Sequence, residues 1–365
     1  MPELQNAEPI GNHQGSLFKL TDDEYEAIRD LISDANPLQS PESRVPLEMY
    51  TIQQALSELF MDAEMLDRAM ELLILKKNII LQGPPGVGKT FFAKRLAWVT
   101  SGKRDNAKMQ MIQFHQSYSY EDFVQGYRPN SEGRFDLKSG VFYSFCRQAQ
   151  VDGEGSYFFV IDEINRGNLS KVFGEVMMLI EYDKRGREFA MPLIYAHGPD
   201  DKFFIPENLF LIGTMNTADR SLAMVDYALR RRFCFIDMEP AFERTDYQDH
   251  LIRAGADEDL TREIAEKMTE LNDRIEGDKN LGKGFKIGHS YFCPHGEVVP
   301  DRRWFQRVIR GEIEPLLREY WFDDPSEAEN ATEELLAKLE LWISRFRTST
   351  SCCAMPGTSL KSATS

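Results

Sequence analysis

The sequence predicts an α/β fold, a five-stranded parallel sheet sandwiched by helices, followed by a small α-helical domain. First, a short apolar strand at 78–83 runs directly into a glycine-rich loop and then a helix at 91–99. Second, further apolar runs of strand length alternate with helical segments up to residue 239, as in doubly wound parallel sheets. Third, from about residue 242 the apolar residues recur with helical periodicity alone.

Composition limits the classes of protein to consider. With 365 residues the chain is long enough for two domains, and its 42% hydrophobic content supports buried cores. No apolar run of membrane-spanning length and no signal-peptide pattern occurs, so a cytoplasmic location without membrane contact is expected. Five cysteines and six histidines follow no metal or disulfide spacing, which predicts reduced, structural thiols. The net charge of −16 predicts that this chain alone binds DNA weakly.

The chain divides into four expected segments. Residues 1–45 are rich in Asn, Gln, Pro and Ser, with one helical patch at 22–33, and predict a linker or a remnant N-terminal segment. Residues 46–241 form the α/β nucleotide-binding domain, with two helices before its first strand and a β-hairpin insertion near 187–208. Residues 242–347 are expected to form the α-helical domain. Residues 348–365 are expected to be a disordered or non-native tail.

The loop after the first strand has the composition of a phosphate-binding loop. Its glycines allow backbone N–H groups to turn toward an oligophosphate, and the following helix directs its positive end at the same anion. Lys89 then reaches the β- and γ-phosphates, and the Thr90 hydroxyl binds Mg²⁺. The predicted nucleotide-binding residues are Gly83, Pro84, Pro85, Gly86, Val87, Gly88, Lys89 and Thr90.

A second buried strand, 157–162, ends in two carboxylates. Parallel sheets place ligands at the carboxyl ends of their strands. We therefore expect Asp162 to complete the Mg²⁺ site with Thr90, and Glu163 to polarise the attacking water. Residues 109–115 predict another strand and 170–181 the helix after Glu163. The polar and aromatic segment 117–129 between them either lines a pore or partner surface or packs beneath a loop.

The strand at 209–216 adds a third polar group, because it ends at Asn216, with Asp219 three residues beyond. We expect Asn216 to orient water or sense the γ-phosphate, and Asp219 to bind that water or fix Asn216. Arg231 and Arg232, ahead of the last strand at 233–239, are candidate arginine fingers for a neighbouring subunit's nucleotide. Such fingers require an oligomeric ring.

These motifs together resemble AAA+ NTPases, and among them the McrB family of the McrBC modification-dependent restriction systems. The residues that carry the resemblance are Gly83–Thr90, Asp162–Arg166, Met215–Ser221, Ala228–Phe233, Gln113–Phe123 and Gly288–Phe292. The resemblance implies a GTPase with Mg²⁺ that forms a homo-hexamer. It also implies a McrC-like partner, and the nuclease activity is expected in that partner. The complex is expected to translocate, driven by GTP, and to cleave double-stranded DNA that bears methylated cytosine.

Two features leave alternatives open. The family places a modified-DNA-binding domain before the AAA+ module, whereas only about 50 residues precede it here, so recognition of methylated cytosine by this chain is not expected. Asn216 to Asp219 matches the Asn-x-x-Asp with which small GTPases read guanine, but its place beside the phosphate loop directs it to the γ-phosphate. The residues alone therefore leave GTP and ATP open. An ATP-driven MoxR-like remodelling chaperone is the alternative, and a nucleotide-dependent ring scaffold is disfavoured by Glu163 and Asn216.

Overall fold

The computed structural model describes residues 47–153, 155–219, 227–296 and 298–349, with the side chains of 338–349 left out. The expected linker at 1–45 with its helical patch lies outside these ranges, and so does the expected tail apart from 348–349, which end a helix. Among the described helices, none is both long enough and apolar enough to cross a membrane.

The predicted five-stranded parallel sheet is confirmed. Its strands, in spatial order, are β2 (Met109–Gln113), β5 (Tyr157–Asp162), β8 (Leu209–Asn216), β1 (Asn78–Gly83) and β9 (Cys234–Asp237). The strand that leads into the phosphate loop, β1, thus lies between β8 and β9. Because all five strands run the same way, the polar residues that end β1, β5 and β8 meet at one edge.

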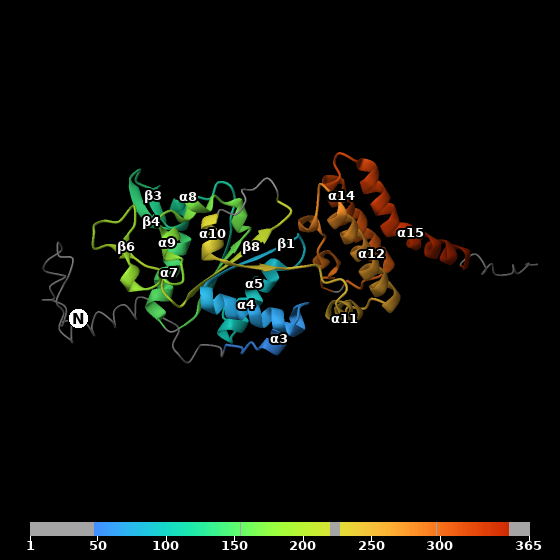
Figure 1. The fold of residues 1–365 in the computed structure, drawn as a ribbon, viewed down its shortest axis with the longest axis horizontal. Helices are drawn as coiled ribbons and strands as arrows, with labels where there is room; N and C mark the ends of the chain where they lie inside the picture. Colours follow the sequence, from blue (N-terminus) through green and yellow to red (C-terminus); the bar gives the residue numbers. More distant parts are fainter. Residues whose placement is uncertain (1–46, 154, 220–226, 297, 350–365) are drawn as a thin grey trace, which may run out of the picture. The chain divides into compact units, whose positions relative to one another are not determined.

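Helices cover both faces of the sheet (Figure 1). One face packs against α3 (Ile52–Glu58), α4 (Ala63–Lys76) and α5 (Lys89–Ser101). The other packs against α6 (Tyr120–Phe123), α7 (Val141–Asp152), α8 (Leu169–Phe173) and α9 (Val176–Leu179). Side chains of β1 alternate accordingly, since Ile79 and Leu81 join the first core and Ile80 joins the second. All three are fully buried, which explains why these strands are continuous apolar runs.

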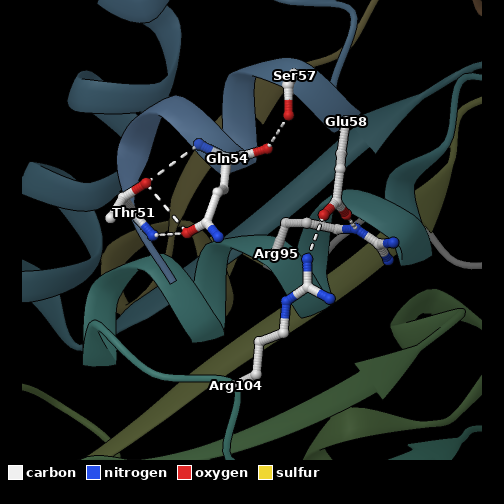
Figure 2. Close-up of polar contacts among 6 residues, drawn as sticks. All are labelled: Thr51, Gln54, Ser57, Glu58, Arg95 and Arg104. Carbon is white, nitrogen blue, oxygen red and sulfur yellow. Dashed lines mark hydrogen bonds and ion pairs between the residues drawn. The ribbon is translucent and has the colours of Figure 1, made fainter. Parts of the chain in front are cut away.

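Helix α3 is fixed at both ends (Figure 2). At its start, the Thr51 hydroxyl accepts a hydrogen bond from the Gln54 N–H at 3.2 Å, and the Gln54 side chain accepts one from the Thr51 N–H at 2.8 Å. This reciprocal capping box satisfies two N–H groups that the helix leaves unpaired. At its end, Glu58 accepts a hydrogen bond from Arg95 Nε of α5 at 2.8 Å and pairs with Arg104 through its other oxygen. The residues that follow α3 are therefore held at a fixed place beside α5.

The expected β-hairpin near 187–208 is present but short, since β6 (Met191–Pro192) and β7 (Lys202–Phe203) pair antiparallel over two residues each. A second hairpin, β3 (Gln125–Pro129) with β4 (Phe135–Ser139), was not predicted. It uses part of the aromatic segment at 117–129, for which the sequence left open a pore or partner surface and packing beneath a loop. Phe123 is fully buried against other aromatic rings, whereas Tyr127 on β3 is half exposed.

The helix predicted at 170–181 is divided into α8 and α9 at Gly174. This glycine has φ +51°, a backbone conformation that residues other than glycine rarely adopt. A Cβ at this position would also lie 2.9 Å from the ring of Tyr120. Helix α7 was not predicted, although its buried residues Phe142, Phe145 and Ala149 follow helical spacing.

The predicted α-helical domain is confirmed and has its own core, in which Ile264, Phe305 and Leu317 are fully buried. Its helices are α11 (Thr245–Arg253), α12 (Glu258–Gly277), α13 (Arg302–Val308), α14 (Glu314–Tyr320) and α15 (Pro325–Ser349). A π-helical turn at Ile309–Ile313 joins α13 to α14. Between α12 and α13, the glycine-rich segment forms short 3₁₀ turns at Lys283–Phe285 and His289–Phe292. Cys146, Cys234 and Cys293 are free thiols.

Candidate functional site

The glycine-rich loop between β1 and α5 has the backbone that phosphate binding requires. Gly86 and Gly88 have φ of +80° and +77°, which glycine adopts without the strain that a Cβ introduces. Lys89 is 7% exposed, and its ammonium donates to the carbonyls of Gly83 at 3.0 Å and Pro84 at 2.8 Å. The lysine therefore folds back on the loop that it serves, and a phosphate that enters must exchange for these carbonyl contacts.

Burial lowers the pKa of Lys89 to about 8, although the carboxylates Asp162, Asp219 and Glu163 act in the opposite direction. The cause is that a buried ammonium loses hydration that its neighbours replace only in part. At pH 8 a substantial fraction of Lys89 is thus neutral. A bound triphosphate raises this pKa again, because its negative charge favours the ammonium.

Thr90 and Asp162 have the arrangement that a magnesium ion requires. The Thr90 hydroxyl donates to Asp162 Oδ1 at 2.7 Å, and the Thr214 hydroxyl of β8 donates to the same oxygen at 2.5 Å. Adjacent ligands of an octahedral Mg²⁺ lie roughly 3 Å apart, given Mg–O distances of about 2.1 Å. The Thr90 hydroxyl and one Asp162 oxygen fit that spacing, and the described residues contain no cluster of three or more His, Cys, Asp or Glu that competes as a metal site.

Glu163 lies directly after Asp162 in a left-handed backbone conformation, with φ 50° and ψ 47°. Such a conformation costs a residue other than glycine about 1 kcal/mol or more, and it is found most often at functional sites. The Glu163 N–H donates to the Thr214 hydroxyl at 3.1 Å, which helps to hold this turn. Its carboxylate Oε2 accepts hydrogen bonds from Gln113 Nε2 and pairs with Arg166 Nε, both at 2.9 Å.

Arg166 is shared between two carboxylates of the site. Its Nε is 2.9 Å from Glu163 and 3.8 Å from Asp219 Oδ2. That Asp219 oxygen is buried and accepts no hydrogen bond from the residues that the structure describes. Arg166 thus occupies one oxygen of Glu163 and lies next to a second carboxylate, that of Asp219.

Asn216 occupies the place that the sequence predicted, beside the phosphate loop. It is the partner of Gly83 in the parallel pairing of β8 with β1. The next residue, Thr217, donates its N–H to the Gly83 carbonyl at 3.1 Å and its hydroxyl to the Gly284 carbonyl of the helical domain at 3.0 Å. The Asn-x-x-Asp segment therefore lies at the phosphate end of the site, away from any base.

The arginines of α10 (Tyr227–Arg232) differ in availability. Arg232 is 17% exposed and pairs with Glu181 at 2.9 Å, whereas Arg231 is 76% exposed and its nearest carboxylate, Glu181 again, is 3.6 Å away. The guanidinium of Arg230 lies over the ring of Phe235, 5.8 Å from its centre. Of the two predicted fingers, Arg231 is thus the one whose charge faces solvent.

The helical domain contacts the phosphate loop directly. The Gly288 N–H donates to the Pro85 carbonyl at 2.9 Å, and the Ser290 N–H donates to the Gly86 carbonyl at 2.8 Å. A Cβ on Gly288 would lie 2.0 Å from the Gly86 carbonyl carbon, so only glycine allows this approach.

Next to the loop, a cavity of about 400 Å³ opens between the α/β domain and the helical domain. Its lining includes Leu59–Met61 after α3, Val87 and Gly88 of the loop, Phe91 of α5, Asp237–Pro240 after β9, and His250, His289 and Cys293–His295 of the helical domain. The cavity adjoins the phosphate loop through Val87 and Gly88 and has the size of a small-molecule site.

Several of these contacts were not foreseen from the sequence. In the sequence, Gln113 and Arg166 stand out only as parts of the motifs shared with the McrB family, and Thr214 only as part of a strand. Gln113 ends β2, next to β5 in the sheet, and this register was a usable signal because neighbouring parallel strands end together. The position of Arg166, in contrast, follows from a 3₁₀ turn (Ile164–Arg166) that the sequence does not reveal.

Comparison with known proteins supplies the family. Residues 78–233 match the model of the AAA domain of the dynein-related subfamily, and residues 263–329 match that of the McrB α-helical lid domain. The chain is 52% identical over 292 residues to the Type IV methyl-directed restriction enzyme EcoKMcrB subunit of Escherichia coli (strain K12), covering 79% of this chain. The chain is therefore an AAA+ NTPase that resembles McrB.

The McrB match leaves part of the relative uncovered, since it spans 63% of the Escherichia coli protein. A more distant relative is the Type II restriction enzyme BsuMI component YdiS of Bacillus subtilis (strain 168), 24% identical over 290 residues, 67% of this chain and 79% of that protein. The predicted AAA+ fold, with its α-helical McrB lid, is therefore confirmed. The helical domain described above is the part of the chain that matches the McrB lid model.

Proposed function

We propose that this chain hydrolyses GTP as the motor subunit of a McrBC-like restriction complex. In this proposal it forms a homo-hexameric ring and drives translocation and cleavage of double-stranded DNA with a McrC-type partner, which carries the nuclease. Direct DNA binding by this chain is weak, in keeping with its net charge of −16. Support comes from the McrB lid match and from the relative, which is named as a subunit of a methyl-directed restriction enzyme.

The observation that carries the hydrolytic role is the meeting of Lys89, Asp162, Glu163 and Asn216 at one edge of the sheet. Lys89 binds the β- and γ-phosphates once it leaves the carbonyls of the loop, and its buried ammonium has little competing water there. When bound, Mg²⁺ held through Thr90 and Asp162 neutralises charge on the phosphate oxygens.

Water activation falls to Glu163 in this proposal. Its carboxylate accepts a proton from the attacking water after Arg166 shifts away, while Asn216 orients that water or senses the γ-phosphate. Arg231 reaches a neighbouring subunit's nucleotide in the ring, where a guanidinium stabilises charge on the transferred phosphoryl group. Arg232, held by Glu181 of its own chain, supports the helix that presents Arg231.

The experiment that tests this function compares hydrolysis of GTP with that of ATP, with and without a McrC-type partner. We expect GTP to be the better substrate and the partner to raise turnover. Lys89→Ala is expected to abolish nucleotide binding, whereas Glu163→Gln keeps binding and loses most turnover, because Glu163 acts only in the transition state. Equal rates with ATP and no response to the partner would instead favour an ATP-driven MoxR-like chaperone.

A further inference from the structure

The cavity beside the phosphate loop is lined in part by aromatic side chains. Phe60 and Phe91 lie on the side of α3 and α5, and His250 and His289 on the side of the lid. Burial lowers the pKa of His289 to about 4, and that of His250 also lies below its usual value, mainly through burial. Both rings are therefore neutral near pH 7 and, packed edge-on against Phe60, they form an uncharged aromatic wall of the cavity.

Three carboxylates line the same cavity: Glu58, Asp237 and Glu239. Both oxygens of Glu58 are engaged, one with Arg95 and one with Arg104 (Figure 2). A carboxylate fixed in this way serves the anchoring of α3. It is not well placed to accept hydrogen bonds from a ligand as well.

The two remaining carboxylates flank Met238 after β9 and differ in their partners. Glu239 pairs with Lys283 of the lid at 3.3 Å, and it is the main cause of the raised pKa of that lysine, to which Asp237 adds a smaller effect. Asp237 Oδ1 accepts a hydrogen bond from Gln82 Nε2 at 2.7 Å. Its Oδ2 accepts none from the part of the chain that the structure describes. Gln82 therefore orients Asp237 through Oδ1, which keeps a second lone pair, and leaves Oδ2 open.

We propose that Asp237 is the residue that reads guanine, by accepting hydrogen bonds from the N1–H and the 2-amino group of the base. This inference rests on the proposed GTP-dependent function. A carboxylate is an acceptor only, and its two oxygens match the two adjacent donors of guanine. Adenine has an unprotonated N1 and no 2-amino group, so it meets the carboxylate with a lone pair instead of a donor. The same side chain thus favours GTP and disfavours ATP.

The placement of the Asn-x-x-Asp segment supports this assignment. Asn216 pairs with Gly83 at the phosphate end of the site, and Thr217 is bonded to the same glycine, so this segment does not serve the base. Asp237 ends β9, on the other side of β1 from β8. The two acidic segments therefore divide the nucleotide between them, one at the phosphates and one at the base.

The test compares GTP, ITP, XTP and ATP binding to the full chain in a Glu163→Gln background, which slows hydrolysis. Asp237→Asn is expected to lower GTP affinity roughly 10- to 100-fold, the usual value of a bidentate base contact. XTP affinity is expected to rise above that of GTP, because the asparagine amide donates to the 2-carbonyl of xanthine. The preference for GTP over ITP, which lacks the 2-amino group, is expected to disappear.

The matched control is Glu239→Gln, which removes the same charge from the same cavity and is expected to change GTP affinity by less than about threefold. A wild-type chain without preference for GTP over ATP refutes the proposed function itself. A wild-type preference that Asp237→Asn leaves intact, or that Glu239→Gln removes, refutes only the assignment of Asp237. If Asp237→Asn loses affinity for all four nucleotides, the assignment of Asp237 is also refuted, because the assignment requires XTP binding to survive this substitution.

Discussion

Nucleotide binding by this chain is expected to take up a proton, and the amount taken up is expected to grow with pH. Burial lowers the pKa of Lys89 to about 8 in the empty site. Bound phosphates restore the ammonium, because nearby negative charge raises the pKa of a lysine. The proton bound on complex formation then equals the fraction of Lys89 that was neutral beforehand.

The magnitude follows from that pKa. A group with a pKa of about 8 is roughly 0.1 neutral at pH 7, about 0.5 at pH 8 and about 0.8 at pH 8.5, and these are the expected numbers of protons taken up. Linkage then requires the apparent affinity to fall about fourfold between pH 7 and pH 8.5. The sign is fixed, since a rise in pH removes the ammonium that binding needs.

Isothermal titration calorimetry measures this uptake, with a GTP analogue that has a non-hydrolysable β,γ bridge and two buffers of different ionisation enthalpy at each pH. The phosphate of the ligand, whose last proton leaves near pH 6, releases a proton on binding, and this release shrinks as pH rises. It therefore cannot account for a net uptake at pH 8. Uptake below about 0.1 at pH 8, or uptake that does not increase from pH 7 to pH 8.5, would show that Lys89 stays charged in the empty loop.

Three further outcomes are expected. Arg231→Ala chains should bind nucleotide yet hydrolyse it on the order of 10³-fold more slowly. Mixing them with Lys89→Ala chains should restore part of that rate, because an intact pocket of the first chain then faces an intact Arg231 of the second. No recovery in rings whose assembly is confirmed would refute action between subunits. Asp219→Asn should lower turnover about fivefold, because Arg166 then stays paired with Glu163. Adding Arg166→Gln should restore the rate. A double variant slower than Asp219→Asn would contradict the exchange of Arg166 between Glu163 and Asp219. Asn78→Ala should lower the free energy of unfolding by about 2–3 kcal/mol in urea titrations, because it removes three buried hydrogen bonds; a loss under 1 kcal/mol would contradict this.

The sheet and its phosphate edge could be predicted because local patterns determine them. Strands buried on both faces consist of continuous apolar runs. The predicted bounds of β1, β5 and β8 therefore agree with the observed bounds to within a residue or two. The parallel order then brings Asp162 and Asn216 to the edge where Gly83 lies. This part of the site depends on strand ends, and strand ends follow from topology.

The contacts that hold Glu163 and line the cavity could not be predicted, because they depend on turns and on pairing between distant parts of the chain. Glu163 has a positive φ, a conformation that only the assembled fold imposes. Its contact with Gln113 joins residues 50 positions apart in the chain. The cavity for the base is likewise built from α3, β9 and the lid, so its acceptors were invisible as a motif.

The arginine run shows how tertiary context separates residues that the sequence presents as equivalent. Asn78 at the start of β1 donates to the Arg232 carbonyl at 3.0 Å, and Glu181 after α9 binds the Arg232 guanidinium, so this residue anchors the end of α10 from both sides. Arg231, one position earlier, is 76% exposed, and its Nη2 lies 3.6 Å from Glu181. A side chain that serves a neighbouring subunit must be exposed before assembly, and the helix that carries it must be held firmly. The pairing of Arg232 provides the second condition and thereby makes Arg231, rather than both residues, the one to test across a subunit boundary.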